Sequence, residues 1–290
     1  MADITVVGPG AIGGTVCAWL SQDPRHRVTL AARSRLERLD VHTPQGDMSV
    51  QPVVLSDPAL AKPADWVLIA TKAYDVVGAS HWLEHSCNSD TLVAVLQNGV
   101  EHVARFAPYL PVEQIVPVMV DCPAERIRPG VIRQRGPARM VVPRGGPGAA
   151  FMDLFANTRI VVTDSPDFRT EVWKKLCYNS VGALSAILLK GAAIARHEGV
   201  VQLMYGIVHE CIAVGRAEGA RLADSVADNV ISGYQAAPAD SINSMHADRI
   251  AGRLMEIDAR NGVIVRLGRK HRIATPLNAM IVDLLQAAQG

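Results

Sequence analysis

Residues 3–14 read DITVVGPGAIGG, a glycine pattern between an apolar strand and an apolar helix that reaches Leu20. In a Rossmann unit the first glycine permits the tight turn, the second lets the backbone approach a pyrophosphate, and the third allows the helix to pack closely on the strand. The helix N-terminus also presents N–H groups to the phosphates. A glycine-rich turn of some other α/β protein is the structural alternative. The pattern predicts a dinucleotide site formed by Gly8, Gly10, Ala11, Ile12 and Gly13.

Short β-branched runs alternate with helical patterns as far as about residue 165, which is typical of a parallel sheet with crossover helices. The strand patterns lie at 4–7, 28–31, 66–70, 92–96 and 115–119. Gly and Pro separate three further apolar runs, at 131–132, 140–142 and 159–162, which we expect to add antiparallel strands at one end of the sheet.

From Phe168 onward the apolar residues recur at helical spacing, at 172–189, 201–217, 226–234 and 277–287. The predicted fold class is therefore α/β, with an N-terminal Rossmann-like doubly wound domain followed by an all-α C-terminal domain. We place the NADP-binding domain at residues 1–166 and the helical domain, with substrate-binding and catalytic groups, at residues 167–290.

The bulk composition excludes several kinds of partner. The chain of 290 residues carries 29 Lys and Arg against 28 Asp and Glu, so no excess of basic charge indicates nucleic-acid or anionic-membrane binding. Its five cysteines are far apart and form no CxxC pair, so we predict reduced thiols and no metal site. Because the first strand pattern begins at Ile4 and no apolar run has membrane-spanning length, we expect a cytoplasmic protein.

The end of the second predicted strand bears on the choice of nicotinamide cofactor. An Asp or Glu at this point binds the ribose of NAD, whereas residues 31–35 read AARSR. Because a guanidinium makes bidentate contacts with phosphate, Arg33 and the missing acid favour NADP. Lys72 follows the third predicted strand and is a second candidate for the 2′-phosphate. A solvated surface charge is the alternative for both cations.

Two segments carry groups suited to the reduction of a ketone. Asn98 follows the strand pattern at 92–96, at the edge where open α/β sheets bind ligands, although Asn-Gly is also a common turn. Lys175 and Asn179 are four residues apart and share one face of a predicted helix. A partly desolvated lysine can have its pKa lowered enough to protonate a developing alkoxide, so Lys175 is the candidate general acid. An exposed helix lysine is the alternative.

Near the C-terminus, residues 243–248 (NSMHAD) and 252–258 (GRLMEID) bring hydroxyl, amide and carboxylate groups together. Ser244 is a candidate donor to a substrate carboxylate. Glu256 is a candidate to orient Lys175 or to accept from a substrate hydroxyl. The structural alternatives are a helix cap for Ser244 and a solvated helix face for Glu256.

These segments, in this order, resemble the ketopantoate reductase (2-dehydropantoate 2-reductase) family over nearly the whole chain. The resemblance rests on GPGAIGG, TKAYDV, LQNGV, EVWKKLCYN, NSMHADRIAGRLMEIDARNG and HRIATPLNAMI. It implies an NADPH-dependent oxidoreductase that converts a 2-oxo acid to a 2-hydroxy acid, with ketopantoate reduced to pantoate in pantothenate biosynthesis as the first expectation.

The resemblance also implies a role for each site residue. Gly8, Gly10 and Gly13 would bind the pyrophosphate, and Arg33 and Lys72 would approach the 2′-phosphate. Lys175 would be the general acid, and Glu256 would complete the catalytic site. Asn98, Asn179 and Ser244 would hold the substrate, with Asn98 contacting the cofactor as well.

The chain departs from the family pattern at the substrate end. Members commonly carry a second asparagine one turn after the position of Asn179, whereas residues 182–186 read GALSA. Residues 116–124 read VPVMVDCPA, where small and hydroxylated residues are common in the family. These departures leave the identity of the substrate acid undetermined. They suggest an apolar pocket that accepts several branched 2-oxo acids.

Two alternatives to ketopantoate reduction remain open. One is a dehydrogenase of another branched or bulky 2-hydroxy acid on the same scaffold, and the other is a non-catalytic NADP-sensing protein. The joint presence of Asn98, Lys175, Ser244 and Glu256 argues against a sensor, which needs only the glycines and Arg33. The partners we expect are a small-molecule 2-oxo acid and a second copy in a homodimer, and neither nucleic acid nor a membrane.

Overall fold

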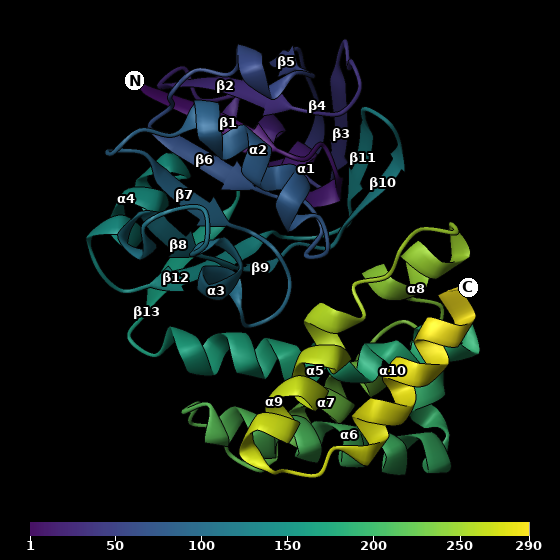
Figure 1. The fold of residues 1–290 in the computed structure, drawn as a ribbon. Helices are drawn as coiled ribbons and strands as arrows, with labels where there is room; N and C mark the ends of the chain where they lie inside the picture. The colour runs from purple at the N-terminus through teal and green to yellow at the C-terminus, as the bar shows by residue number, and fades with distance from the viewer. Residues whose placement is uncertain (290) are drawn as a thin grey trace. The chain divides into compact units, whose positions relative to one another are not determined.

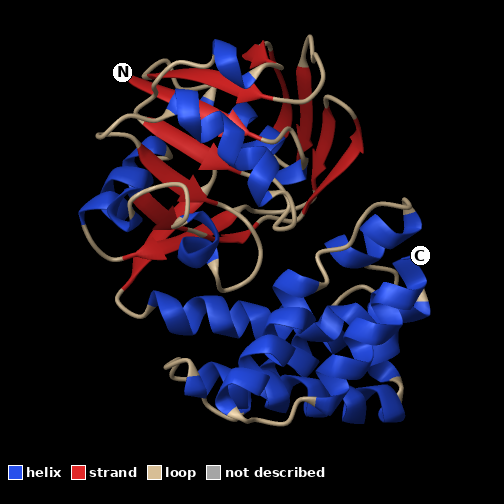
Figure 2. Cartoon of the chain, in the orientation of Figure 1, coloured by secondary structure: helices blue, strands red, loops and turns tan. Residues whose placement is uncertain are grey.

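The computed structural model describes residues 1–289, which form two compact units that divide after Phe168 (Figure 1). All described strands belong to the first unit, and helices build the second (Figure 2). The predicted fold class, a doubly wound Rossmann-like domain followed by an all-α domain, is confirmed. No helix within residues 1–289 is both long and apolar enough to cross a bilayer.

A six-stranded parallel sheet forms the centre of the first unit, in the order β5-β2-β1-β6-β7-β8. Its strands are β1 (Ala2–Val7), β2 (His26–Ala31), β5 (Val53–Leu55), β6 (Trp66–Ile69), β7 (Leu92–Val95) and β8 (Ile115–Pro117). Neighbouring side chains along a strand point to opposite faces, so Leu68 and Ile69 enter two different cores. Both faces of the sheet are therefore covered, as a parallel sheet requires.

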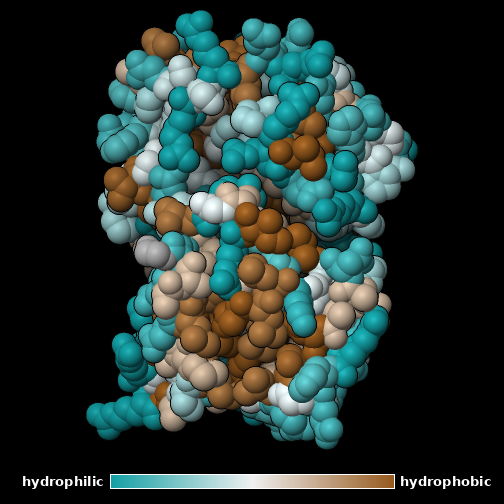
Figure 3. All heavy atoms as spheres, turned by 90° about the vertical axis from the view of Figure 1, so that its right-hand side faces the viewer, coloured by the Kyte–Doolittle hydropathy of each residue, from teal (hydrophilic) through white to brown (hydrophobic). Residues whose placement is uncertain are grey.

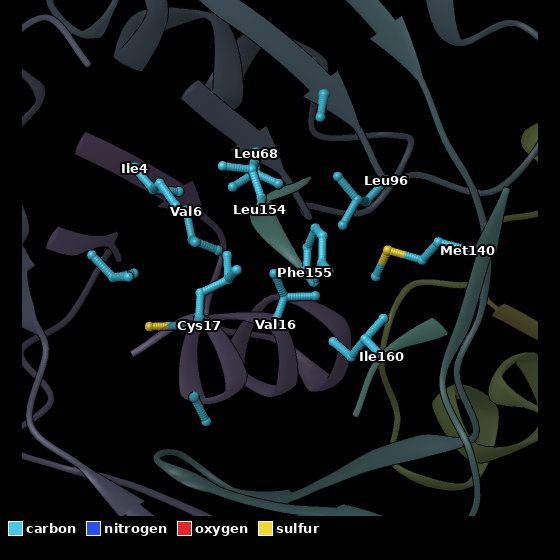
Figure 4. Packing of buried hydrophobic residues seen from close by; sticks show 14 of the residues in the cluster. Ile4, Val6, Val16, Cys17, Leu68, Leu96, Met140, Leu154, Phe155 and Ile160 are labelled. Carbon is cyan, nitrogen blue, oxygen red and sulfur yellow. The ribbon is translucent and has the colours of Figure 1, made fainter. Parts of the chain in front are cut away.

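The two faces are covered by different helices. One core contains side chains of α1 (Ala11–Leu20) and α4 (Gly146–Leu154), and the other contains side chains of α2 (Val76–Ser86) and α3 (His102–Phe106). Figure 4 shows the first of these cores, where Val6 and Leu68 of the sheet lie among Val16 and Phe155. Two 3₁₀ turns, Pro58–Leu60 and Val112–Gln114, lie in the connections.

Two smaller sheets complete this unit, and they correct the sequence analysis. One has the order β10-β11-β3-β4, and the other has the order β13-β12-β9. The strands are β3 (Leu39–Thr43), β4 (Gly46–Val50), β9 (Met119–Asp121), β10 (Ala124–Arg128), β11 (Val131–Gln134), β12 (Arg139–Pro143) and β13 (Val161–Ser165).

The expectation that the runs after residue 130 add antiparallel strands to the main sheet is wrong. The strands belong to two separate sheets, in which β11 is antiparallel to β10 and parallel to β3, and β12 is antiparallel to β9 and parallel to β13. β11 packs on α1 instead, where a β-carbon on Gly14 would overlap the side chain of Ile132. The predicted strand at 115–119 is also two strands, since β8 ends at Pro117, which has no N–H for a ladder, and β9 pairs with β12 instead.

The second unit is built from α5 (Phe168–Leu188), α6 (Glu198–Ala217), α7 (Ser225–Ala236), α8 (Ser244–Ile250), α9 (Val263–His271) and α10 (Pro276–Gln289). A 3₁₀ turn at Ala192–Arg196 and a π-helical turn, η4, at Asp258–Gly262 connect them. Sequence periodicity missed α8 and α9, which are short. The thiols of Cys177 and Cys211 are buried 3.5 Å apart where α5 packs on α6.

A buried polar network holds four elements of the helical unit together. The amide of Asn261 donates to the Ser180 carbonyl oxygen on α5 (3.1 Å) and to Asn278 Oδ1 on α10 (2.9 Å). Asn278 donates in turn to the carboxylate of Glu210 on α6 (2.6 Å), which also accepts the backbone N–H groups of Leu277 and Asn278. Because buried polar groups are costly unless bonded, this network fixes the register of η4 against α5, α6 and α10.

Candidate active site

The glycine turn after β1 has the geometry of an anion site. Gly8 has φ = 103°, a conformation that side chains disfavour, and its N–H donates to the Ala31 carbonyl oxygen on β2 (3.0 Å). α1 follows with Gly10 as its N-cap and with no side chain bonded to the cap. A β-carbon on Gly10 would meet no atom within 4 Å, so the backbone there is open to a ligand. These features fit the pyrophosphate of a dinucleotide.

The strand register brings the other cofactor candidates to the same edge. Val7 pairs with Ala31 on one side and with Ile69 on the other, and Ile69 pairs with Val95. The next residues of these strands therefore leave the sheet side by side. Each candidate follows a strand end by two or three positions: Arg33 after β2, Lys72 after β6 and Asn98 after β7.

Arg33 has a solvent-exposed guanidinium. Its side chain is 92% exposed, and its Nη2 lies 3.9 Å from Asp75 Oδ2. An exposed ion pair at this distance contributes little, so it leaves the guanidinium able to meet a phosphate. Asp75 is held in the loop that contains Lys72, since its N–H donates to the Lys72 carbonyl oxygen (2.9 Å). Sequence reasoning missed this carboxylate, which is distant from Arg33 in the chain.

The amide of Gln97 fixes the loops that carry Lys72 and Asn98. Its Nε2 donates to Thr71 Oγ1 (3.1 Å) and to the Lys72 carbonyl oxygen (3.2 Å). The Asn98 carbonyl oxygen accepts from Arg105 (2.8 Å), and Gly99 has φ = 98°. Gln97 is only 4% exposed, so it positions the loops and does not face solvent. The sequence feature that could have predicted this role is a polar residue directly after an apolar strand pattern.

On α5, Lys175 and Asn179 are both half-buried, one helical turn apart. Lys174, the neighbouring lysine, is exposed, and its ammonium lies 3.0 Å from the carboxylate of Glu171. The two lysines therefore occupy different environments on the same helix.

Ser244 is the first residue of α8, but Asn243 caps the helix. Asn243 Oδ1 accepts from the N–H groups of Met245 (3.0 Å) and His246 (3.1 Å). The Ser244 hydroxyl is bonded to a different group, since it accepts from the Arg260 guanidinium (2.6 Å). The helix-cap alternative for Ser244 is therefore wrong, and sequence reasoning missed Arg260.

The same segment is tied to α5 just beyond Asn179. Asn243 Nδ2 donates to the Gly182 carbonyl oxygen (2.8 Å). A β-carbon on Gly182 would lie 2.8 Å from the Tyr234 hydroxyl and 3.0 Å from Asn243 Nδ2. The Tyr234 hydroxyl donates to the Tyr178 carbonyl oxygen (3.2 Å), and burial raises the pKa of this phenol well above its usual range. Polar atoms therefore fill the space beside Gly182. The sequence had suggested an apolar pocket at this position.

Glu256 lies in the loop between α8 and η4 and is 5% exposed. It is therefore not on a solvated helix face. Glu256 and Arg260 are four residues apart and both buried, so one short segment carries a buried carboxyl group and a buried guanidinium.

The chain is similar to known proteins over its whole length. Residues 4–146 match the family profile described as "Ketopantoate reductase PanE/ApbA", and residues 167–289 match "Ketopantoate reductase PanE/ApbA C terminal". The 2-dehydropantoate 2-reductase of Caulobacter vibrioides is 53% identical over 288 residues, with 99% of each chain covered. That of Mycobacterium tuberculosis is 40% identical over 296 residues, covering 98% of this chain and 97% of its own.

The fold is also that of solved structures. A PanE/ApbA family ketopantoate reductase from Ralstonia eutropha superposes with a TM-score of 0.90 at 30% identity, covering 99% of this chain and 98% of its own. The two profiles together span both units, so the likeness includes the glycine turn after β1 and the helical segments described above.

Proposed function

The chain belongs to the ketopantoate reductase family, and from that premise we propose that it uses NADPH to reduce a 2-oxo acid, ketopantoate first, to the 2-hydroxy acid. The observation that carries the proposal is the register of β2, β1, β6 and β7, which gathers the glycine turn, Arg33, Lys72 and Asn98 at one sheet edge. Open α/β sheets bind their ligands at this edge. Pantoate, the product of ketopantoate reduction, would enter pantothenate biosynthesis.

The residues present fit NADPH. The uncapped start of α1 would hold the pyrophosphate, with the N–H groups of Ala11, Ile12 and Gly13 directed to its oxygens. Arg33 and Lys72 would bind the 2′-phosphate, for which the exposed guanidinium supplies a planar pair of donors. When bound, the cofactor supplies a hydride to the ketone carbon. The nearby carboxylate of Asp75 would repel a 2′-phosphate, so the attraction of the phosphate to Arg33 has to exceed this repulsion.

The chain's own groups would handle the proton and the substrate. We assign Lys175 to hold the proton that passes from Nζ to the oxygen of the reduced ketone, which balances the hydride gained at carbon. Asn98 and Asn179 would donate their amide hydrogens to the substrate, and Ser244 would contact its carboxylate. Glu256 would orient the lysine and stabilise its charged form.

The test is consumption of NADPH, followed at 340 nm, with ketopantoate and a panel of other 2-oxo acids. Turnover with at least one acid is expected, and turnover with NADH should be weaker. A protein that binds NADPH but reduces no acid would instead be the NADP sensor, a binding protein without catalysis.

A reductase of another branched or bulky acid is the second candidate, and Gly182 favours it. Family members commonly carry an asparagine one turn after the position of Asn179, and here no side chain is present at Gly182. A D-mandelate dehydrogenase solved with NADH has this fold, with a TM-score of 0.90 at 22% identity. The panel should therefore include benzoylformate, the 2-oxo acid that corresponds to mandelate.

We also propose a homodimer. A dimeric ketopantoate reductase from Staphylococcus aureus has the same fold, with a TM-score of 0.88 at 23% identity. Figure 3 shows a broad apolar surface on the helical unit. Exposed apolar side chains of that unit include Ile250, Leu254, Met280 and Leu284. Apolar patches of this kind mark protein interfaces, and a second copy is the occupant we propose.

Sedimentation velocity tests the dimer. Ile250→Asp should shift a dimer to a monomer, because a buried carboxylate at an interface is costly. Leu60→Asp, which changes an equally exposed apolar residue of the first unit, is the matched control and should leave the dimer intact. A wild-type monomer at micromolar concentration would refute this part of the proposal.

A further inference from the structure

Arg260 is a buried arginine that the proposed chemistry does not use. It lies in η4, between the network residue Asn261 and the loop of Glu256, and is 3% exposed. One terminal nitrogen donates to Ser244 Oγ (2.6 Å). Its Nε is buried without a hydrogen-bond partner within residues 1–289.

The charge of Arg260 is also uncompensated in the part of the chain that the structure describes. No carboxylate of residues 1–289 forms an ion pair with it, and Asp258 of the same turn pairs with Arg266 (3.0 Å) instead. Its side-chain hydrogen bond is to the neutral hydroxyl of Ser244. A guanidinium stays protonated at every physiological pH, and a buried cation without a counter-ion is strongly unfavourable. A buried guanidinium in these surroundings is therefore suited to bind an anion.

The position of this guanidinium connects it to the substrate groups. Asn261, the next residue, donates to the Ser180 carbonyl oxygen, and Asn243, next to Ser244, donates to that of Gly182. Both bonds fall on the α5 turn that directly follows Asn179. Arg260 and Ser244 are thus fixed over the turn where the family's second asparagine is missing.

We propose that Arg260 is a specificity-determining residue that binds the carboxylate of the 2-oxo acid together with Ser244. The inference rests on the proposed function. The planar fork of a guanidinium matches the two oxygens of a carboxylate, and the unpartnered Nε is one of the donors that such a pair uses. The carboxylate supplies the missing counter-charge, so acids bind and neutral ketones of the same shape do not.

The test compares an acid with its uncharged ester in two variants. With saturating NADPH, Arg260→Gln should lower kcat/KM for 2-oxoisovalerate by about tenfold to a hundredfold, mainly through KM. The value for methyl 2-oxoisovalerate should change by less than about threefold, because the ester carries no charge. Arg269→Gln, an exposed arginine on α9, is the matched control and should change neither. The Kd of NADPH should stay the same in all variants.

A structural role for Arg260 would give a different pattern. Acid and ester would then lose efficiency equally, and that result would overturn the proposal, as would an unchanged KM for the acid. Should Arg260→Gln not fold, Arg260→Lys keeps the charge but not the fork. It should raise KM for the acid alone, and equal losses for acid and ester would again contradict the assignment.

The proposed function and this inference fail in distinguishable ways. If the wild type reduces no 2-oxo acid, the proposed function is refuted, and calorimetry with 2-hydroxyisovalerate then tests Arg260 directly. The wild type should bind this anion at least about tenfold more tightly than Arg260→Lys does. Equal affinities, or no binding by the wild type, would overturn the inference.

Discussion

A β-carbon on Gly13 would overlap the carbonyl oxygen of Gly8, so the turn after β1 and the first turn of α1 pack backbone against backbone. Ala70, which follows β6, closes the same space, since its β-carbon would lie 2.9 Å away. Gly10, between the two, has open space beside it. Glycines of one motif therefore meet two different physical requirements.

These requirements predict that two small substitutions affect different properties, the stability of the fold in one case and cofactor binding in the other. Gly13→Ala should destabilise the fold by about 1–3 kcal/mol, because backbone has to shift to admit the methyl group. Gly10→Ala should change stability by less than about 0.5 kcal/mol. It should nevertheless weaken NADPH binding at least about tenfold, because its methyl group points where a pyrophosphate approaches. Urea unfolding and fluorescence titration measure the two quantities, and equal losses of stability would contradict the assignment.

Cofactor preference should depend on Arg33. Because a charged contact to a phosphate contributes on the order of a few kcal/mol, NADPH should bind at least about tenfold more tightly than NADH. Arg33→Ala should narrow this difference by weakening NADPH. Arg35→Ala, an exposed arginine two residues later, is the control and should leave the preference as it is. Equal dissociation constants of the wild type for both cofactors would show that the exposed guanidinium does not select the phosphate.

The two adjacent lysines of α5 should differ in their effect on turnover. Removal of a positioned proton donor costs about a hundredfold to ten-thousandfold in rate, so Lys175→Ala should fold, bind NADPH and turn over very slowly. Lys174→Ala removes only an exposed pair with Glu171 and should be nearly neutral. The comparison is kcat at saturating NADPH and acid. Similar losses in both variants would mean that Lys175 is not the acid.

Several branched acids should be substrates. The polar atoms beside Gly182, the Tyr234 hydroxyl and Asn243 Nδ2, already donate to backbone carbonyl oxygens. We therefore expect kcat/KM for 2-oxoisovalerate and benzoylformate to be within about a hundredfold of the value for ketopantoate. A preference for ketopantoate above about ten-thousandfold would mean that another group binds its hydroxyl.

Acid should weaken the first unit through Asp23. Hydrogen bonds from Arg25, with a further one from Asn157, lower the pKa of this buried carboxyl to about 2, below its usual 3.8. A depressed pKa in the folded state stabilises the fold above about pH 4, and this contribution is lost as the pH falls toward 2. Asp23→Asn should therefore lower Tm at pH 7, and the difference from the wild type should shrink below pH 4.

Asp153→Asn is the control for this pH dependence. Asp153 also lies near Arg25 (3.6 Å), but its side chain is 73% exposed. Its replacement should have little effect at any pH. A difference between Asp23→Asn and the wild type that stays constant from pH 7 to pH 2.5 would show that the effect is not one of charge.

The amino-acid sequence by itself determined the fold class and the sheet edge at which we propose that the cofactor binds. Both follow from local patterns, because short apolar runs such as 4–7 and 66–70 alternate with helical patterns, which predicts a parallel sheet with crossover helices. Once the strands are parallel, the residues that follow them meet at one edge, so the convergence of Arg33, Lys72 and Asn98 needed no tertiary information. The helix register of Lys175 and Asn179 is local in the same way.

Only the tertiary structure decided the pairing of β11 with β3 and the environment of Arg260. The two strands are about ninety residues apart, and Ile132 of β11 fills the space beside Gly14 of α1, a contact that no local pattern describes. In the sequence Arg260 stands in DARNG, where an arginine is ordinarily a solvated charge. Its contact with Ser244 and its burial arise because the Asn261 network fixes η4 against α5. Burial and counter-charge depend on residues distant in the chain, so the folded chain decides them.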